Sequence, residues 1–265
     1  MPYLLLLLTL ENRKEILLFQ GDLVKLYPGG TRRRNGAVAP RGSPVLYWDS
    51  GIAAGGDRMD AQTFWAVIGA YNQQTWAFQI PLLAFLLGMM VLSYTKKVPW
   101  AAKCALGILH LFIAAVFFAG FGELPIQRLF ALPLFLACGL LFLYECRHNS
   151  ADVLRPPTLP QALLLLLYFL YPLCSVLLGN TFPELVTHIM PCPAVSLGIA
   201  LYSGYSRKNG LLLALLTLWG LTGVKSLLFR AYEDLILLLC GLYGLCLLAR
   251  EFRKTDLNRR YGRRR

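Results

Sequence analysis

The sequence predicts an all-α, polytopic membrane helix bundle with seven spans. Of its 265 residues, 57% are hydrophobic and only 15% are charged, whereas an average soluble domain carries about 25% charged residues. The apolar residues also gather in long runs, such as 211–221 and 235–249, which is typical of helices that cross a bilayer. So few charged residues could not cover a soluble surface.

The apolar runs place the spans one after another along the chain. They lie at 76–94, 100–121, 128–144, 159–178, 194–205, 210–225 or a little beyond, and 232–249. An amphipathic lead-in, 59–75, precedes the first span. The fifth span is short of the roughly 20 residues that a helix needs to cross, so it depends on its Pro-rich approach. If that span is re-entrant, the count falls to six.

Boundary residues support these limits. Trp65, Trp76, Trp100 and Tyr232 lie near predicted span ends, where aromatic side chains anchor helices at the membrane interface. Glu145 and Arg147 end the third span, and we expect no special role for either.

The basic residues predict the orientation. The loops after spans one, three and five and the segment after span seven hold fifteen Lys and Arg, whereas the opposite side holds only Arg128, Lys225 and Arg230 from Met59 onward. Positive residues concentrate on the cytoplasmic side of membrane proteins. We therefore expect the N-terminus outside and the C-terminus inside, with residues 59–250 as the bundle and 251–265 as a basic cytoplasmic tail.

Residues 1–58 differ from the rest of the chain. They hold eight Lys and Arg and five Asp and Glu, and their only apolar run, 3–10, is too short to span and lacks the basic flank of a signal peptide. In the predicted orientation, this basic segment would have to cross the membrane without a signal peptide and lie outside the cell. We interpret 1–58 as either a disordered extension or an over-extended reading of the gene.

A start at Met59 is the favoured interpretation. Ala54-Gly55-Gly56 can be encoded with the bases AGGAGG, a bacterial ribosome-binding sequence, and seven nucleotides then separate it from the Met59 codon. The sequence thus predicts a mature protein that begins at Met59 and lies in the bacterial inner (plasma) membrane.

The composition limits the kinds of partner that the protein is expected to bind. The net charge of +12 would suggest nucleic acid in a soluble protein, but here it lies in loops and the tail, so the expected partners are the lipid bilayer and, at the tail, anionic lipid head groups. Seven cysteines form no C-x-x-C pair, and the six other than Cys192 lie in or at the ends of apolar runs, where cysteine is typical of a packing residue. No nucleotide, hydrolase or metalloprotease motif occurs. The sequence indicates no cofactor, no metal and no nucleic acid, and it does not identify a protein partner.

Four stretches carry a resemblance to a known family. They are Phe64-Trp65 through Tyr71-Asn72 to Trp76 and Gln79; Pro191-Cys192-Pro193 followed by Gly198; Leu218-Trp219-Gly220; and Glu233-Asp234-Leu235 with Gly241. From Phe64 to about Ala249 the chain resembles an uncharacterised family of bacterial multi-pass membrane proteins, a domain of unknown function. The resemblance implies an integral membrane protein and no catalytic roles.

Ionisable residues at membrane depth are functional candidates because they are costly to bury. His110 lies ten residues into span two, about 15 Å deep, and is either a neutral hydrogen-bonded histidine or part of a proton relay or ligand site. Between spans four and five, Glu184, His188 and Cys192 lie on the outer side. Pro191 and Pro193 forbid a regular helix through Cys192, and Pro193 is well placed as the first residue of span five.

The junction of spans six and seven supplies the other candidates. Lys225 ends one apolar run and Asp234 opens the next, either as a structural ion pair or as a pair that opens for a substrate or proton. We expect the Pro191–Pro193 break and this junction to meet and form the principal polar pocket, with Lys225 donating to carbonyls that the prolines leave free.

Three functions fit these patterns. The first is the handling of a small solute or ion at an outer-facing polar pocket. The second is an intramembrane enzyme that uses His110 or Glu184 as an acid–base group. The third is a structural or partner-binding membrane subunit. The first two predict a polar cavity, and the third predicts a bundle packed tightly throughout.

Overall fold

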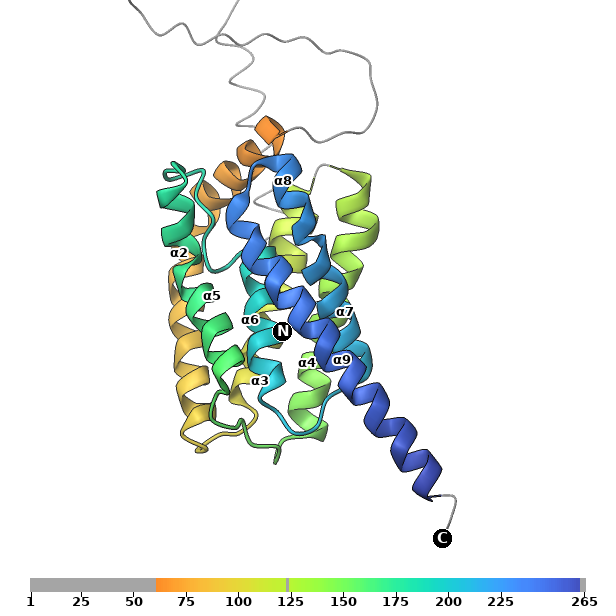
Figure 1. The fold of residues 1–265 in the computed structure, drawn as a ribbon. Helices are drawn as coiled ribbons and strands as arrows, with labels where there is room; N and C mark the ends of the chain where they lie inside the picture. Colours follow the sequence, from red (N-terminus) through yellow and green to blue (C-terminus); the bar gives the residue numbers. More distant parts are fainter. Residues whose placement is uncertain (1–60, 123, 263–265) are drawn as a thin grey trace, which may run out of the picture. The chain divides into compact units, whose positions relative to one another are not determined.

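Six long helices and one short helix make up the part of the chain that the structure describes (Figure 1). The computed structural model describes residues 61–122 and 124–262, with side chains up to Lys254. These residues belong to one compact unit, Gly55–Arg265. The predictions for 1–58 and for a start at Met59 lie outside the described residues.

The long helices match the length and apolarity of membrane spans. They are α2 (Ala61–Tyr94), α3 with the π-helix η1 (Ala101–Phe121), the π-helix η2 with α4 (Gln127–His148), α5 (Leu159–Leu177), α7 with η3 and α8 (Gly210–Phe229), and η4 with α9 (Tyr232–Asp234 and Leu235–Gly262). The part of the chain that the structure describes contains no strand. The all-helical fold class is therefore confirmed, with six helices that could span a membrane.

The helices run alternately between two ends of the bundle, called here the upper and lower ends as drawn in Figure 1. Helix α2 begins at the upper end, and α9 ends at the lower end. Many large apolar side chains on the helices face outward, including Phe78 (66% exposed), Leu129 (79%) and Leu177 (77%). A surface of this kind matches a lipid environment rather than water.

Helix α2 is longer than the predicted first span. Residues 59–75 were expected to form a separate lead-in, but Ala61–Tyr94 is one helix of 34 residues. The reason lies in a stripe of buried polar side chains, Asn72, Thr75 and Gln79, which continues across the predicted boundary. These residues share one helix face because they are spaced three and four apart, so the helix has no reason to break between them.

The polar stripe of α2 holds the segment between α5 and α6. This segment, residues 178–190, is called the outer loop after the side of the membrane on which the sequence predicts it. Asn72 Nδ2 donates to the carbonyls of Pro183 and Leu185, both at 2.7 Å, and Tyr71 Oη donates to the Ile189 carbonyl at 2.6 Å. The loop carbonyls, which have no helical donors, are thereby satisfied away from water.

Helix α6 (Pro191–Ser203) starts within the bundle rather than at its upper end, because the outer loop descends before the helix begins (Figure 1). Its 13 residues give a length of about 20 Å, less than a full span. The prediction that Pro191 and Pro193 forbid a helix through Cys192 was wrong. Both prolines fit the first turn, where a backbone N–H has no intrahelical partner to lose.

Glycines allow close contact between α7 and α9. A Cβ atom on Gly220 would lie 2.6 Å from the Gly241 Cα, and one on Gly241 would lie 2.5 Å from the Gly220 carbonyl carbon. One turn further on, a Cβ on Gly244 would lie 2.6 Å from the Thr217 hydroxyl. Small residues at such crossings bring two helix backbones together and maximise van der Waals contact.

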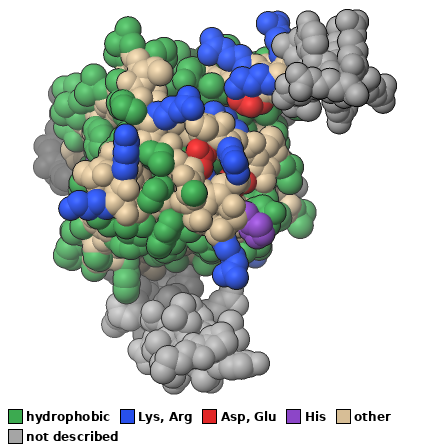
Figure 2. Space-filling view, turned by 90° about the horizontal axis from the view of Figure 1, so that it is seen from below, with side chains coloured by type: hydrophobic (Ala, Val, Ile, Leu, Met, Phe, Trp, Pro, Cys, Tyr) green, Lys and Arg blue, Asp and Glu red, His purple; other side chains and the backbone are tan. Residues whose placement is uncertain are grey.

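The lower end carries most of the basic residues, and Figure 2 shows their side chains spread over this face. In the described chain, they are Lys96, Lys97, Arg147, Arg155, Arg207, Lys208, Arg250, Arg253 and Lys254. Lys103 differs from these residues because it is fully buried, with its ammonium 3.8 Å from both Glu145 and Asp152. The expectation that Glu145 has no special role was wrong, since it compensates this buried charge.

Candidate functional site

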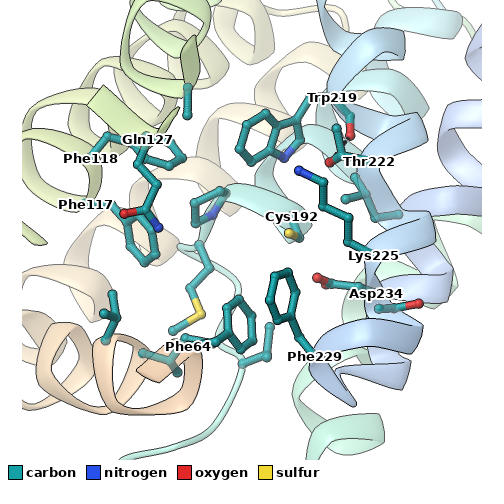
Figure 3. A pocket seen from close by; sticks show the side chains of 18 of the residues that line it. Phe64, Phe117, Phe118, Gln127, Cys192, Trp219, Thr222, Lys225, Phe229 and Asp234 are labelled. Atoms are coloured by element: carbon teal, nitrogen blue, oxygen red, sulfur yellow. Dashed lines mark hydrogen bonds between the residues drawn. The ribbon is translucent and has the colours of Figure 1, made fainter. Parts of the chain in front are cut away.

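A cavity of about 180 Å³ lies among the upper parts of the helices, next to the first turn of α6 (Figure 3). Its walls come from α2, η1, the segment around η2, the end of the outer loop, α6, the α7–α8 helix and the start of α9. Segments far apart in the sequence therefore converge on one space.

Most of the wall is aromatic or aliphatic. Phe64 and Phe229 stack with ring centroids 5.1 Å apart and planes at 11°. Phe118 packs edge-on against Trp219 at 5.6 Å. Rings in these contacts are held in place by their neighbours, so the cavity offers a firm apolar surface to a ligand.

Cys192 and Asp234 supply polar groups on one side of the cavity. Tyr171 Oη donates to Asp234 Oδ1 at 2.8 Å, and the Cys192 thiol also interacts with this carboxylate. Asp234 is the last residue of the short helix η4 and directly precedes α9. Its position at a helix N-terminus favours a negative charge there. Two neutral donors thus hold an acid whose carboxylate faces the cavity (Figure 3).

Lys225 supplies the opposite charge. It is exposed, and its ammonium points into the cavity in Figure 3. No approach of 4.0 Å or less joins it to Asp234, and within the described residues it makes no hydrogen bond. The predicted ion pair between Lys225 and Asp234 was therefore wrong, as was the expected bond from Lys225 to the carbonyls of the proline break. Asp234 takes its bonds from Tyr171 and Cys192 instead.

Two more polar groups beside Lys225 lack partners. The Ser226 hydroxyl is buried, lines the cavity and makes no hydrogen bond. The Trp219 indole N–H is also buried; although it lies near the Cys192 sulfur, it makes no hydrogen bond of normal geometry. Buried donors without partners are rare in folded proteins, so this wall is prepared for an acceptor.

Glu233 is a buried acid beside the cavity that was not predicted from the sequence as a site residue. Its Oε1 accepts from Ser175 Oγ at 2.8 Å and from Asn180 Nδ2 at 3.2 Å, whereas its buried Oε2 has no hydrogen-bond partner. Glu233 ties η4 to α5 and to the start of the outer loop. Glu233 stands directly before Asp234 in Glu233-Asp234-Leu235, one of the four stretches that carry the family resemblance, and this position could have identified it as a candidate.

Two predicted candidates on the outer loop lie away from the cavity. Glu184 is exposed, and its side chain lies beside Gly69 of α2. His188 turns toward α5, where its ring packs on Tyr168 at 5.0 Å. Burial lowers the pKa of His188 below its usual value, and its Nε2 has no hydrogen-bond partner.

His110 occupies the core. It is fully buried between the rings of Phe135 and Phe142, with centroids 5.4 and 5.2 Å away. Its Nδ1 lies 2.8 Å from the Leu106 carbonyl, and its Nε2 has no partner. Because His110 does not line the cavity, it stands apart from the other candidates.

The cavity has no set of metal ligands. Among the described residues, no three His, Cys, Asp or Glu side chains gather as a metal site would require, and His188 turns away from Cys192. Of the six candidates, the structure brings together Cys192, Lys225 and Asp234, and it places Glu184, His188 and His110 elsewhere.

Fold and site together describe an all-helical protein with six helices of membrane-spanning length and a mostly apolar cavity that contains an acid and a lysine. The chain belongs to the family of unknown function DUF6064, whose model matches residues 61–259. This agrees with the resemblance to a domain of unknown function. No curated protein and no solved structure matches the chain.

Proposed function

We propose that this protein is an integral membrane protein that binds a small amphipathic solute in the cavity. The solute enters the cavity from the outer side of the membrane. The observation that carries the proposal is the composition of the wall. Aromatic and aliphatic side chains form most of it, and a few polar groups converge on it from the α7–α8 helix, α6 and the segment before α9. Binding sites for small molecules have this makeup, with an apolar lining and a small number of polar groups that fix orientation.

The distribution of basic residues supports the orientation. Basic side chains collect at the lower end (Figure 2), while the upper end has only Arg128, Lys225 and Arg230 in the described chain. By the positive-inside rule, we propose that the lower end faces the cytoplasm. In this orientation, which is N-out and C-in, the cavity belongs to the outer half of a cell or plasma membrane.

The cavity also separates the competing functions. A purely structural subunit favours a bundle packed throughout, whereas this one leaves about 180 Å³ open. An enzyme that uses His110 or Glu184 is not favoured because neither residue lines the cavity. Solute binding is therefore the function that the geometry supports best.

A thermal-unfolding screen of the purified full chain tests the proposal. The probes are small carboxylates, amines, amino acids and alcohols with aliphatic or single-ring bodies. Val67→Phe adds a ring to the cavity wall, and Val91→Phe makes the same change at a 60% exposed position of α2. At least one class of probe should stabilise the wild type and Val91→Phe but not Val67→Phe. Equal responses from both variants, or no response to any class, would contradict the proposal.

A further inference from the structure

The two charged groups of the cavity lack counter-charges inside the protein. Asp234 is held by a phenol and a thiol, both neutral, and Lys225 makes no ion pair in the part of the chain that the structure describes. Both side chains nevertheless face one cavity (Figure 3). Opposite charges on separate parts of a wall, with space between them, form a site for a ligand that carries both signs.

We infer that the cavity binds a small zwitterion, an α-amino acid with an apolar side chain, whose carboxylate meets Lys225 and whose ammonium meets Asp234. This inference rests on the proposed function and names the class of solute. A ligand with a single charge would leave one of the two protein charges without a counter-charge, so it would gain one charge-assisted contact instead of two. A zwitterion compensates both and adds no net charge to the site.

The groups around Lys225 suit a carboxylate. Ser226 and Trp219 line the same wall, and each has a buried donor without a normal hydrogen-bond partner. A carboxylate has two oxygens and about four acceptor positions, so it can accept from these donors as well as from the ammonium. Since Lys225 has no internal partner, ligand binding displaces no bond from it.

The groups around Asp234 suit an ammonium. Its Oδ1 accepts from Tyr171, and a carboxylate keeps further lone pairs for other donors. An ammonium brings three donors and the opposite charge, and charge-assisted hydrogen bonds of this kind are the stronger ones.

The apolar wall limits the size of the side chain. A cavity of about 150 Å³ lined by apolar groups is large enough for benzene, and this one has about 180 Å³. The stacked rings of Phe64 and Phe229 and the edge of Phe118 present surfaces to an aliphatic or single-ring group. A branched side chain such as that of leucine fits this scale.

Three matched probes test the inference by isothermal titration of the purified full chain. L-leucine carries both charges, 4-methylpentanoate lacks the ammonium, and 3-methylbutylamine lacks the carboxylate. L-leucine should bind at least about tenfold more tightly than either analogue. Asp234→Asn should remove its advantage over 4-methylpentanoate, and Lys225→Met its advantage over 3-methylbutylamine. Arg230→Met, a basic residue of the same end that does not line the cavity, should retain both preferences.

Each alternative result has a defined meaning. If 4-methylpentanoate or 3-methylbutylamine binds as tightly as L-leucine, the zwitterion assignment is overturned while binding of an amphipathic solute stands. If none of the three binds, the assignment is overturned, and the broader screen decides the proposed function separately. If Asp234→Asn does not fold, the affinities of the three probes for the wild type and for Lys225→Met still test the assignment. If Lys225→Met still prefers L-leucine to 3-methylbutylamine, the assignment is contradicted.

Discussion

At the scale of single residues, Asp234 connects three parts of the structure. It ends η4 directly before α9, accepts from Tyr171 of α5 and faces Cys192 of α6. A carboxylate can serve both donors at once, whereas an amide offers only one acceptor oxygen and adds two donors of its own. The effect of a substitution here therefore reaches beyond the cavity.

Asp234→Asn should lower the stability of the protein far more than Glu251→Gln. The amide places N–H groups beside donors, and a buried donor left without a partner costs about 1–3 kcal/mol. Glu251 contacts the exposed Lys254 at 2.9 Å near the lower end, and an exposed pair of this kind contributes little. Thermal unfolding in detergent measures both variants, and similar midpoints would show that Asp234 has no special role.

His188 should make stability depend on pH. Its lowered pKa means that the folded protein disfavours the protonated ring, so its contribution is present above the unfolded pKa of about 6.5. That contribution decreases as the pH falls below this value toward the folded pKa. His188→Gln should flatten the loss of stability between pH 7 and pH 5, as measured by thermal unfolding. A variant that loses as much stability as the wild type would refute this role.

At the scale of elements, the outer loop depends on one face of α2. Asn72 alone satisfies two loop carbonyls, and Thr187 Oγ1 adds a bond to Gln79 Oε1 at 2.7 Å. The loop positions Pro191 and Cys192 at the cavity, so the polar stripe of α2 indirectly sets the shape of the site.

Asn72→Leu should release the outer loop. The substitution leaves two carbonyls without donors, each worth about 1–3 kcal/mol. Gln74→Leu makes a comparable change at an exposed position of the same helix and serves as the control. Hydrogen exchange should accelerate in residues 178–190 of Asn72→Leu only. Unchanged protection in that variant would mean that other contacts hold the loop.

Gly241→Val should separate α7 from α9. The added Cβ would lie 2.5 Å from the backbone of Gly220, closer than packed atoms tolerate, and backbone cannot move aside as a flexible side chain can. Gly88→Val, where nothing lies within 4 Å of an added Cβ, is the matched control. The yield of monodisperse protein should fall sharply for Gly241→Val alone, and equal yields would argue against this close crossing.

Helix placement followed from apolar runs, because a helix in lipid needs a long uninterrupted one. The runs predicted to end at residues 94, 121 and 178 closely match the observed helix ends at Tyr94, Phe121 and Leu177. Apolar runs do not reveal a stripe of polar side chains that binds another segment, so the predicted start of the first helix was wrong. They also cannot separate a proline that breaks a helix from one in its first turn, so Pro191 was misjudged as well.

At the scale of the whole molecule, the alternating direction of the helices predicted part of the site. Because spans alternate in direction, Cys192, Lys225 and Asp234 were expected near one end, and all three line the cavity. Parity does not show where a side chain points, so it could not tell that Glu184 and His188 face elsewhere. The partner of Asp234 was also unpredictable, since Tyr171 lies 63 residues away in the sequence.

The central claim is that the cavity is reached from outside the cell. Lys225→Cys in a cysteine-free background, at an exposed position that lines the cavity, can be treated in intact cells with a membrane-impermeant methanethiosulfonate reagent. Ser150→Cys in the same background, at an exposed position of the lower end, is the control for the opposite side. We predict that Lys225→Cys reacts in intact cells, whereas Ser150→Cys reacts only after permeabilisation. Reaction of Lys225→Cys only after permeabilisation, or not at all, would contradict the account.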